Sequence, residues 1–127
     1  MQINQVIFHG ENEDKIAEVM TDGVIISKVQ DGLDLMVHPA LQGSGNMILH
    51  QDNISPDFFE LRSGLAGDIL QKFVNYGVHL AVVGDFKDIA SKSLNDFITE
   101  CNRGTSFFFV ADVDTAVEKL AGGIQAE

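Results

Sequence analysis

Apolar and polar residues alternate in two short stretches near the start of the chain. Residues 3–10 read INQVIFHG and residues 15–20 read KIAEVM, with the polar letters GENED forming the turn between them. Such alternation is typical of a strand with one buried face, and a polar turn between two of these strands favours a hairpin. We therefore expect an antiparallel pair of strands, followed at residues 24–26 by a short extended piece.

Apolar residues at helical spacing predict four helices further along the chain. The first, over residues 29–40, would begin after a Ser27 cap with Gln30 completing a capping box, and Pro39 would weaken its last turn. The second covers residues 62–76. The third and fourth are expected to begin at polar capping residues, which are Ser91 or Ser93 for the third and Asp112 or Asp114 for the fourth.

Continuous apolar runs separate these helices. Residues 46–51, 78–86 and 106–112 read NMILHQ, VHLAVVGDF and SFFFVAD, and such runs are typical of strands buried on both faces. The element order β-β-α-β-α-β-α-β-α predicts an α/β fold with a mostly parallel sheet of about five strands and an antiparallel edge hairpin. We expect one domain over residues 1–127, with a frayed tail from residue 122.

Composition and charge narrow the class of protein. The chain has 127 residues, 45% of them apolar, and a formal net charge of −11, which suits a globular domain and disfavours binding to nucleic acid or to anionic membranes. The single cysteine, Cys101, excludes an internal disulfide. With no apparent leader peptide or transmembrane run, we expect a cytoplasmic protein whose partners are proteins, metal ions or small molecules.

Three aspartates each follow a predicted buried strand. Because the carboxyl ends of parallel strands meet at one edge of a sheet, Asp52, Asp85 and Asp112 are expected to gather where α/β folds bind ligands. They could hold Mg²⁺ or, with Lys92 and Arg103, a small molecule. The alternative is that these residues cap helices and turns.

Other chemistry-bearing residues favour structural roles. Asp112 and Asp114 imitate a phosphoaspartyl Asp-x-Asp signature, but the motif lies too near the end of the chain for the remaining catalytic pieces. The better interpretation is that Asp114 caps a helix and that the helix dipole favours Asp112 beside it. No histidine pair has metal-ligand spacing, and Cys101 lies on an apolar helix face, which predicts an inert thiol. The chain carries no nucleophile elbow, P-loop or dinucleotide-binding glycine motif. We therefore expect no catalytic residue, resident metal or cofactor.

A serine with small neighbours stands where the second long helix is expected to begin. Backbone N–H groups at a helix start attract anions, so a phosphate on Ser63 could sit against them and Arg62. The alternative is that Ser63 is an N-cap and the glycines permit close packing. The contact surface expected around this helix start comprises Phe59, Glu60, Arg62, Ser63, Gly64, Asp85 and Phe86.

Long motifs of the chain resemble a known family. QDGLDL, FFELRSGLAGDILQKFVNY, LAVVGDF, SKSLNDFITECNRG and FFFVAD are similar to the bacterial family catalogued as domain of unknown function 4180, which supplies no established activity. More distantly, the element order and FELRSGLAGDIL followed by YGVHLAVVGD resemble STAS domains of the anti-anti-sigma-factor type. That resemblance implies a STAS-like fold, and it implies that Ser63 accepts phosphate from a partner kinase, which breaks their complex. The chain differs from the STAS pattern in having Leu61-Arg62 before this serine.

Two functions of different classes follow. The first is a non-enzymatic, regulatory protein–protein interaction module with Ser63 as phosphoacceptor. The alternative is a small-molecule or Mg²⁺-binding protein or enzyme that uses the carboxyl edge. A concave pocket with converging carboxylates would favour the ligand hypothesis, and a flat or convex surface bearing Ser63 would favour the interaction hypothesis. A homodimer through an apolar helix face also stays open.

Overall fold

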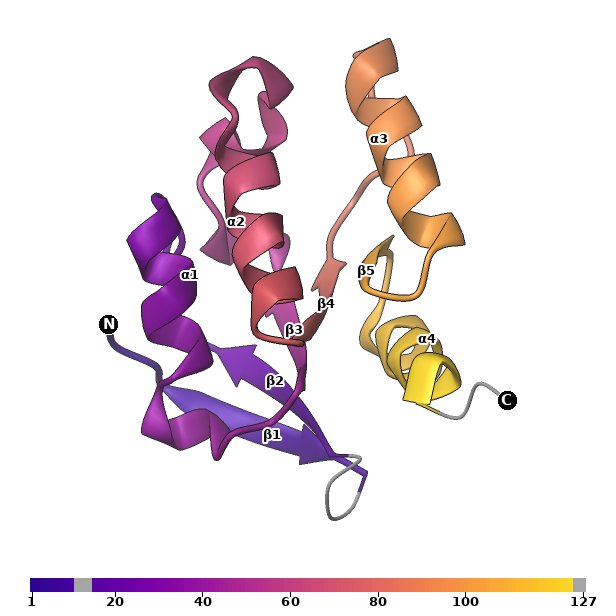
Figure 1. Ribbon diagram of the computed structural model, residues 1–127. Coiled ribbons are helices and arrows are strands. Elements are labelled where there is room, and N and C mark those ends of the chain that lie inside the picture. Colours follow the sequence, from indigo (N-terminus) through magenta and orange to yellow (C-terminus); the bar gives the residue numbers. More distant parts are fainter. Residues whose placement is uncertain (11–14, 125–127) are drawn as a thin grey trace.

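The strands form one sheet in the order of the chain. The computed structural model describes residues 1–10 and 15–124, and within them the strand order is β1-β2-β3-β4-β5 (Figure 1). β1 (Gln5–His9) runs antiparallel to β2 (Ile16–Met20), and β3 (Asn46–His50), β4 (His79–Val83) and β5 (Phe107–Val110) follow in parallel. The predicted α/β fold, a mostly parallel sheet with an antiparallel edge hairpin, is confirmed.

The helices divide unequally between the two faces of the sheet. α1 (Val29–Met36), α2 (Leu65–Asn75) and α3 (Lys92–Arg103) connect successive parallel strands. Right-handed crossovers that step across the sheet in one direction place their helices on one face. α4 (Val113–Ile124) follows the last strand and packs on β3, β4 and β5 from the other face (Figure 1).

Alternating strand residues fill two separate cores. Met47 and Leu49 of β3 point to the face covered by α1, α2 and α3, where they join a cluster with Leu35, Ile69 and Ile98. The intervening Ile48 points to the other face. There it belongs to a smaller cluster with residues of β2, β4, β5 and α4, namely Ile16, Ala81, Phe108, Val110, Ala116 and Leu120.

The first two helices are shorter than the periodicity predicts. The Asp31 carboxylate, and not Gln30, closes the first turn of α1 by accepting hydrogen bonds from the backbone N–H groups of Ser27 and Lys28 at 2.9 and 3.2 Å. α1 ends at Met36, and Pro39 opens a separate 3₁₀ turn, because proline favours a helix start and its ring clashes inside a helix. The predicted continuation through residue 40 is therefore wrong.

α2 begins three residues later than expected. Residues Leu61–Ser63 form a 3₁₀ turn, and Gly64 then adopts a φ of +77°, a left-handed conformation that L side chains rarely adopt. The chain thus changes direction at Gly64 before the regular helix starts at Leu65. Ser63 consequently precedes α2 and is not part of it.

The chain ends also differ from expectation. The expected tail from residue 122 starts too early, since α4 continues to Ile124. Residues 125–127, and residues 11–14 of the predicted hairpin turn, lie outside the described part. In that part, every helix is too short or too polar to cross a membrane.

Candidate functional site

A pocket opens at the carboxyl edge of the sheet, above β3 and β4. Its volume is about 470 Å³. Gln51 and Asp52 reach it directly after β3, and Asp85 and Phe86 reach it after β4. The remaining lining residues come from the connecting segments and from the first turn of α3, and they are Val24, Ile54, Pro56, Phe59, Ile89 and Leu94.

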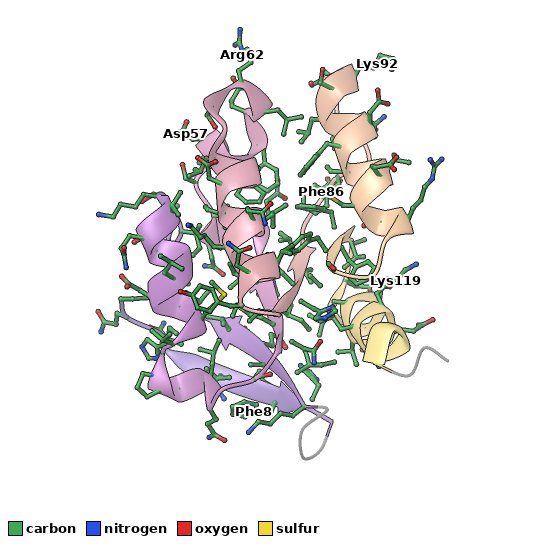
Figure 2. The ribbon with its side chains drawn as sticks, viewed as in Figure 1. Phe8, Asp57, Arg62, Phe86, Lys92 and Lys119 are labelled. Carbon is green, nitrogen blue, oxygen red and sulfur yellow. The ribbon has the colours of Figure 1, made fainter. Side chains whose placement is uncertain are left out.

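A cluster of phenylalanines supports the floor of this pocket. The Phe109 ring lies 5.5 to 6.4 Å, between ring centroids, from the rings of Phe58, Phe59, Phe86 and Phe97. Phe109 and Phe58 are buried, whereas Phe59 and Phe86 are partly exposed and line the pocket. Figure 2 shows Phe86 between α2 and α3. The aromatic wall therefore continues the hydrophobic core to the surface.

Gly84 allows Gln51 to lie across the turn after β4. The Gln51 amide oxygen accepts a hydrogen bond from the backbone N–H of Asp85 at 3.1 Å. A Cβ on residue 84 would stand 2.7 Å from Cβ of Gln51, closer than real side-chain contacts. The glycine therefore fixes the relative position of the turns that carry Asp52 and Asp85.

We expect Gly84→Ala to destabilise the protein by about 1–3 kcal/mol, the range for a residue forced into a packed site. The added methyl would displace Gln51 and break its bond to the Asp85 N–H. Urea unfolding measures the loss, and Gly67→Ala is the control, because a Cβ there meets no atom within 4 Å. Equal stability of the two variants would contradict the contact.

The pocket has a negative character. Asp52 and Asp85 are exposed carboxylates, and the described residues that line the pocket include no lysine, arginine or histidine. Lys92, at the start of α3, is held 2.6 Å from the Asp96 carboxylate, which raises the pKa of the lysine by its hydrogen bond and charge. Figure 2 shows Lys92 at the upper tip of α3, which is the start of this helix, well above Phe86.

Two further residues expected at the site lie elsewhere. Arg103 ends α3, a helix that runs from the carboxyl edge back to the start of β5, so its expected placement at the carboxyl edge is wrong. Asp112 follows β5 but does not line the pocket. Its carboxylate accepts a 2.7 Å hydrogen bond from the Thr115 N–H and caps α4. A helix cap at this position is confirmed, but Asp112 provides it, and Asp114 lies within the first turn of α4.

The cap makes Asp112 a source of pH-dependent stability. The hydrogen bonds from the backbone and side chain of Thr115 lower the pKa of Asp112 below its ordinary value of 3.8. A carboxyl whose pKa is lower in the folded state stabilises the fold above the unfolded-state pKa, and this contribution is lost as the pH falls through the folded-state value. We expect Asp112→Asn, which keeps a capping oxygen but does not titrate, to lose less stability than wild type on acidification below about pH 4. Urea unfolding at a series of pH values measures the difference, and parallel curves would contradict this role.

Ser63 is exposed, but local hydrogen bonds occupy its hydroxyl. Oγ donates to the Asp57 carbonyl at 2.8 Å and accepts from the Leu65 N–H at 3.1 Å. Arg62 extends into solvent, 3.7 Å from the Glu60 carboxylate (Figure 2). These bonds tie the hydroxyl to the turn that precedes α2 and to Leu65, the first residue of the helix, whose N-cap is Gly64. Ser63 lies on the segment that continues from Phe59 of the pocket wall.

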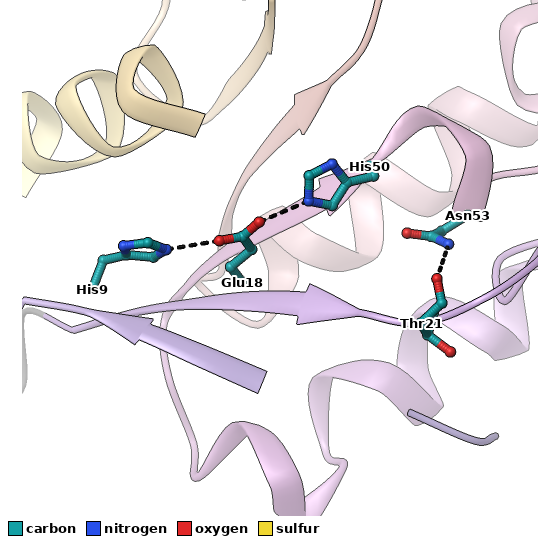
Figure 3. A network of polar contacts seen from close by, with 5 residues as sticks. All are labelled: His9, Glu18, Thr21, His50 and Asn53. Carbon is teal, nitrogen blue, oxygen red and sulfur yellow. Dashed lines mark hydrogen bonds and ion pairs between the residues drawn. The ribbon is translucent and has the colours of Figure 1, made fainter. Parts of the chain in front are cut away.

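A second polar cluster lies on the sheet face beside α4. The Glu18 carboxylate on β2 is 5% exposed and bonds one histidine with each oxygen, Nε2 of His9 and Nε2 of His50, both at 2.8 Å (Figure 3). Ile7 of β1 and Ile48 of β3 pair with Glu18, so each histidine is the diagonal neighbour two residues further along its strand. Sequence spacing alone missed this cluster because only the strand registers bring the three residues together.

The described residues contain no group of three or more histidine, cysteine, aspartate or glutamate side chains arranged to hold a metal ion. Cys101 is half-buried, and burial raises the pKa of its thiol. A raised pKa keeps the sulfur protonated and weakly nucleophilic at neutral pH. The carboxyl-edge pocket is therefore a better candidate site than Cys101.

Comparison with known proteins places the chain in a family. The model of the family described as "Domain of unknown function (DUF4180)" matches residues 11–120. The chain belongs to this family. The resemblance noted in the sequence is thereby confirmed, whereas the more distant resemblance to STAS domains stays a prediction.

The DUF4180 match contains every residue that lines the pocket and begins after β1. No curated protein and no solved structure matches the chain.

Proposed function

We propose that this DUF4180 protein is a binding module whose carboxyl-edge pocket takes a small organic cation with an apolar body. The observation that carries the proposal is the pairing of two carboxylates, Asp52 and Asp85, with an apolar wall that contains Phe59 and Phe86. A concave site of this kind is the shape that favours a ligand over a flat protein contact.

The size of the pocket sets the scale of the ligand. About 470 Å³ lies within the range of roughly 300–1,000 Å³ seen for small-molecule sites. The apolar lining would bury a hydrocarbon or aromatic group, and each square ångström removed from water contributes roughly 25 cal/mol. Affinity would thus come mainly from the apolar body of the ligand.

Charge decides which polar group the ligand carries. The start of α3 faces the same edge and contributes a partial positive charge of about +0.5, which would favour an anion. Two carboxylates outweigh it, and Ser91 already occupies the Leu94 N–H at that helix start. An ammonium group placed between Asp52 and Asp85 would therefore be favoured, and the aromatic rings nearby add attraction for a cation.

A matched set of probes tests the proposal. Phenethylamine, phenethyl alcohol and hydrocinnamate share a phenyl ring on a short chain and differ in carrying a cation, a neutral hydroxyl or an anion. We expect calorimetric titration at low salt to rank the cation first, at least about tenfold tighter than the anion, which corresponds to 1.4 kcal/mol. Equal binding of the three, or tighter binding of the anion, would refute the proposed charge selectivity.

A regulatory protein contact at Ser63 is the second candidate, supported by the exposure of Ser63 and of Arg62, whose side chain is 93% exposed. Phosphate on Oγ would remove the hydroxyl proton donated to the Asp57 carbonyl and would put negative charge beside this carbonyl. Affinity capture with Ser63→Ala and Ser63→Glu tests this candidate. Ser93→Glu, a change at another exposed serine near a helix start, is the matched control. A partner lost only with Ser63→Glu would support the candidate, and identical capture by all variants would refute it.

A further inference from the structure

The two edge strands of the sheet, β1 and β5, differ in whether a side chain covers their outer backbone groups. At the β5 edge, the Asn102 side chain on α3 accepts a hydrogen bond from the Phe109 N–H at 2.8 Å and donates one to the Phe109 carbonyl at 3.1 Å. One amide thus occupies both outward backbone groups of Phe109, as a neighbouring strand would. Such cover prevents another strand from pairing with β5 at this point.

The β1 edge has no comparable cover. β1 pairs with β2 along its whole length from Gln5 to His9. Within residues 1–10 and 15–124, no hydrogen bond from an element other than β2 reaches the β1 backbone. Its outer side therefore presents a row of backbone donors and acceptors, which is a template for a further strand.

The composition of β1 suits pairing with itself. The first ten residues carry no aspartate, glutamate, lysine or arginine, in a chain with a net charge of −11. Edge strands that avoid pairing usually carry lysine, proline or a bulge. The β1 sequence QVIFH has neither lysine nor proline, and its register with β2 is continuous, without a bulge. Ile7 also leaves 37% of its surface exposed, on the α4 side of the sheet but beyond β3, β4 and β5, the strands on which α4 packs.

We propose that β1 is a dimerisation edge, where the β1 strand of a second copy of this chain pairs antiparallel about a two-fold axis. An antiparallel pair of identical strands is self-complementary, so one symmetric contact completes the hydrogen bonding of both edges. The uncharged segment lets two acidic copies approach without placing like charges opposite one another. The paired sheets would form one continuous sheet across the dimer.

The test is the molar mass of wild type, Ile7→Lys and Val74→Lys, measured by light scattering across micromolar to millimolar concentrations. Each variant replaces an exposed apolar residue with lysine, on β1 or on α2, and makes the same charge change. We expect wild type and Val74→Lys to approach twice the 13.8 kDa chain mass and Ile7→Lys to stay monomeric. Circular dichroism confirms that Ile7→Lys is folded.

Three outcomes would overturn the proposal. If the wild type stays monomeric at the highest concentration, the proposed dimer does not form. A folded Ile7→Lys that still dimerises places the contact elsewhere, and dissociation by Val74→Lys alone assigns it to the helix face. Amide hydrogen exchange gives a second reading, since protection of β1 amides should rise with protein concentration and stay constant in Ile7→Lys.

Discussion

Phe109→Ala is expected to destabilise the fold by about 3–5 kcal/mol, the range for removing a buried phenylalanine ring. Phe109 is 4% exposed, and its ring packs against four other aromatic rings, which belong to the core, the pocket wall and α3. Its removal leaves a cavity and also takes away aromatic pairs worth about 0.5–1.5 kcal/mol each. The free energy of unfolding in urea, extrapolated to water, measures the effect.

Two further variants locate the source of this loss. Phe107→Ala removes the same ring from the same strand at a partly buried position, so it should cost clearly less. Phe109→Leu keeps an apolar side chain and should recover part of the stability while losing the aromatic contacts. Similar losses for Phe109→Ala and Phe107→Ala would show that the aromatic cluster does not support the pocket.

The second large effect concerns binding. The double variant Asp52→Asn/Asp85→Asn is expected to weaken phenethylamine binding by at least about tenfold. Two unit charges 4 Å apart attract by about 1 kcal/mol in bulk water and by about 4 kcal/mol at an effective dielectric constant of 20, and a tenfold change needs only 1.4 kcal/mol. Because asparagine has nearly the shape of aspartate, binding of phenethyl alcohol should stay the same.

The control keeps the net charge of this variant but changes a different surface. Asp34→Asn/Asp68→Asn neutralises two exposed carboxylates on α1 and α2 that do not line the pocket. Its affinity for phenethylamine should stay close to that of wild type. An equal loss in both double variants would mean that the overall charge of the protein, and not the pocket, attracts the cation.

Much of the fold could be predicted because its elements have clear periods. The continuous apolar runs over β3, β4 and β5 have a single interpretation once helical spacing is recognised between them. Asp52 and Asp85 were predictable at one edge, because neighbouring parallel strands have their carboxyl ends at the same edge of the sheet. Ser91 was also predictable as a cap of α3, where its Oγ accepts from the Leu94 N–H at 3.2 Å.

The parts that could not be predicted depend on irregular backbone and on register. The 3₁₀ turn Pro56–Phe59 carries Phe58 into the core and Phe59 into the pocket wall, and no sequence period marks that division. The contact of Gln51 with Gly84 joins two loops that are far apart in the chain. The bonds between Glu18 and its two histidines require the pairing of β1, β2 and β3 to be known first.

The most direct test of the proposed function is to locate the site at which the cation binds. Titration of phenethylamine into the protein, followed by two-dimensional amide NMR, should shift the backbone signals of Gln51, Asp85, Phe86 and Leu94 together along one saturable curve. Signals from β1 and from the C-terminal half of α2 should stay in place. Saturable shifts confined to the carboxyl-edge pocket are the predicted result. Shifts centred on another surface, or no saturable shift at all, would contradict a cation-binding pocket at this edge.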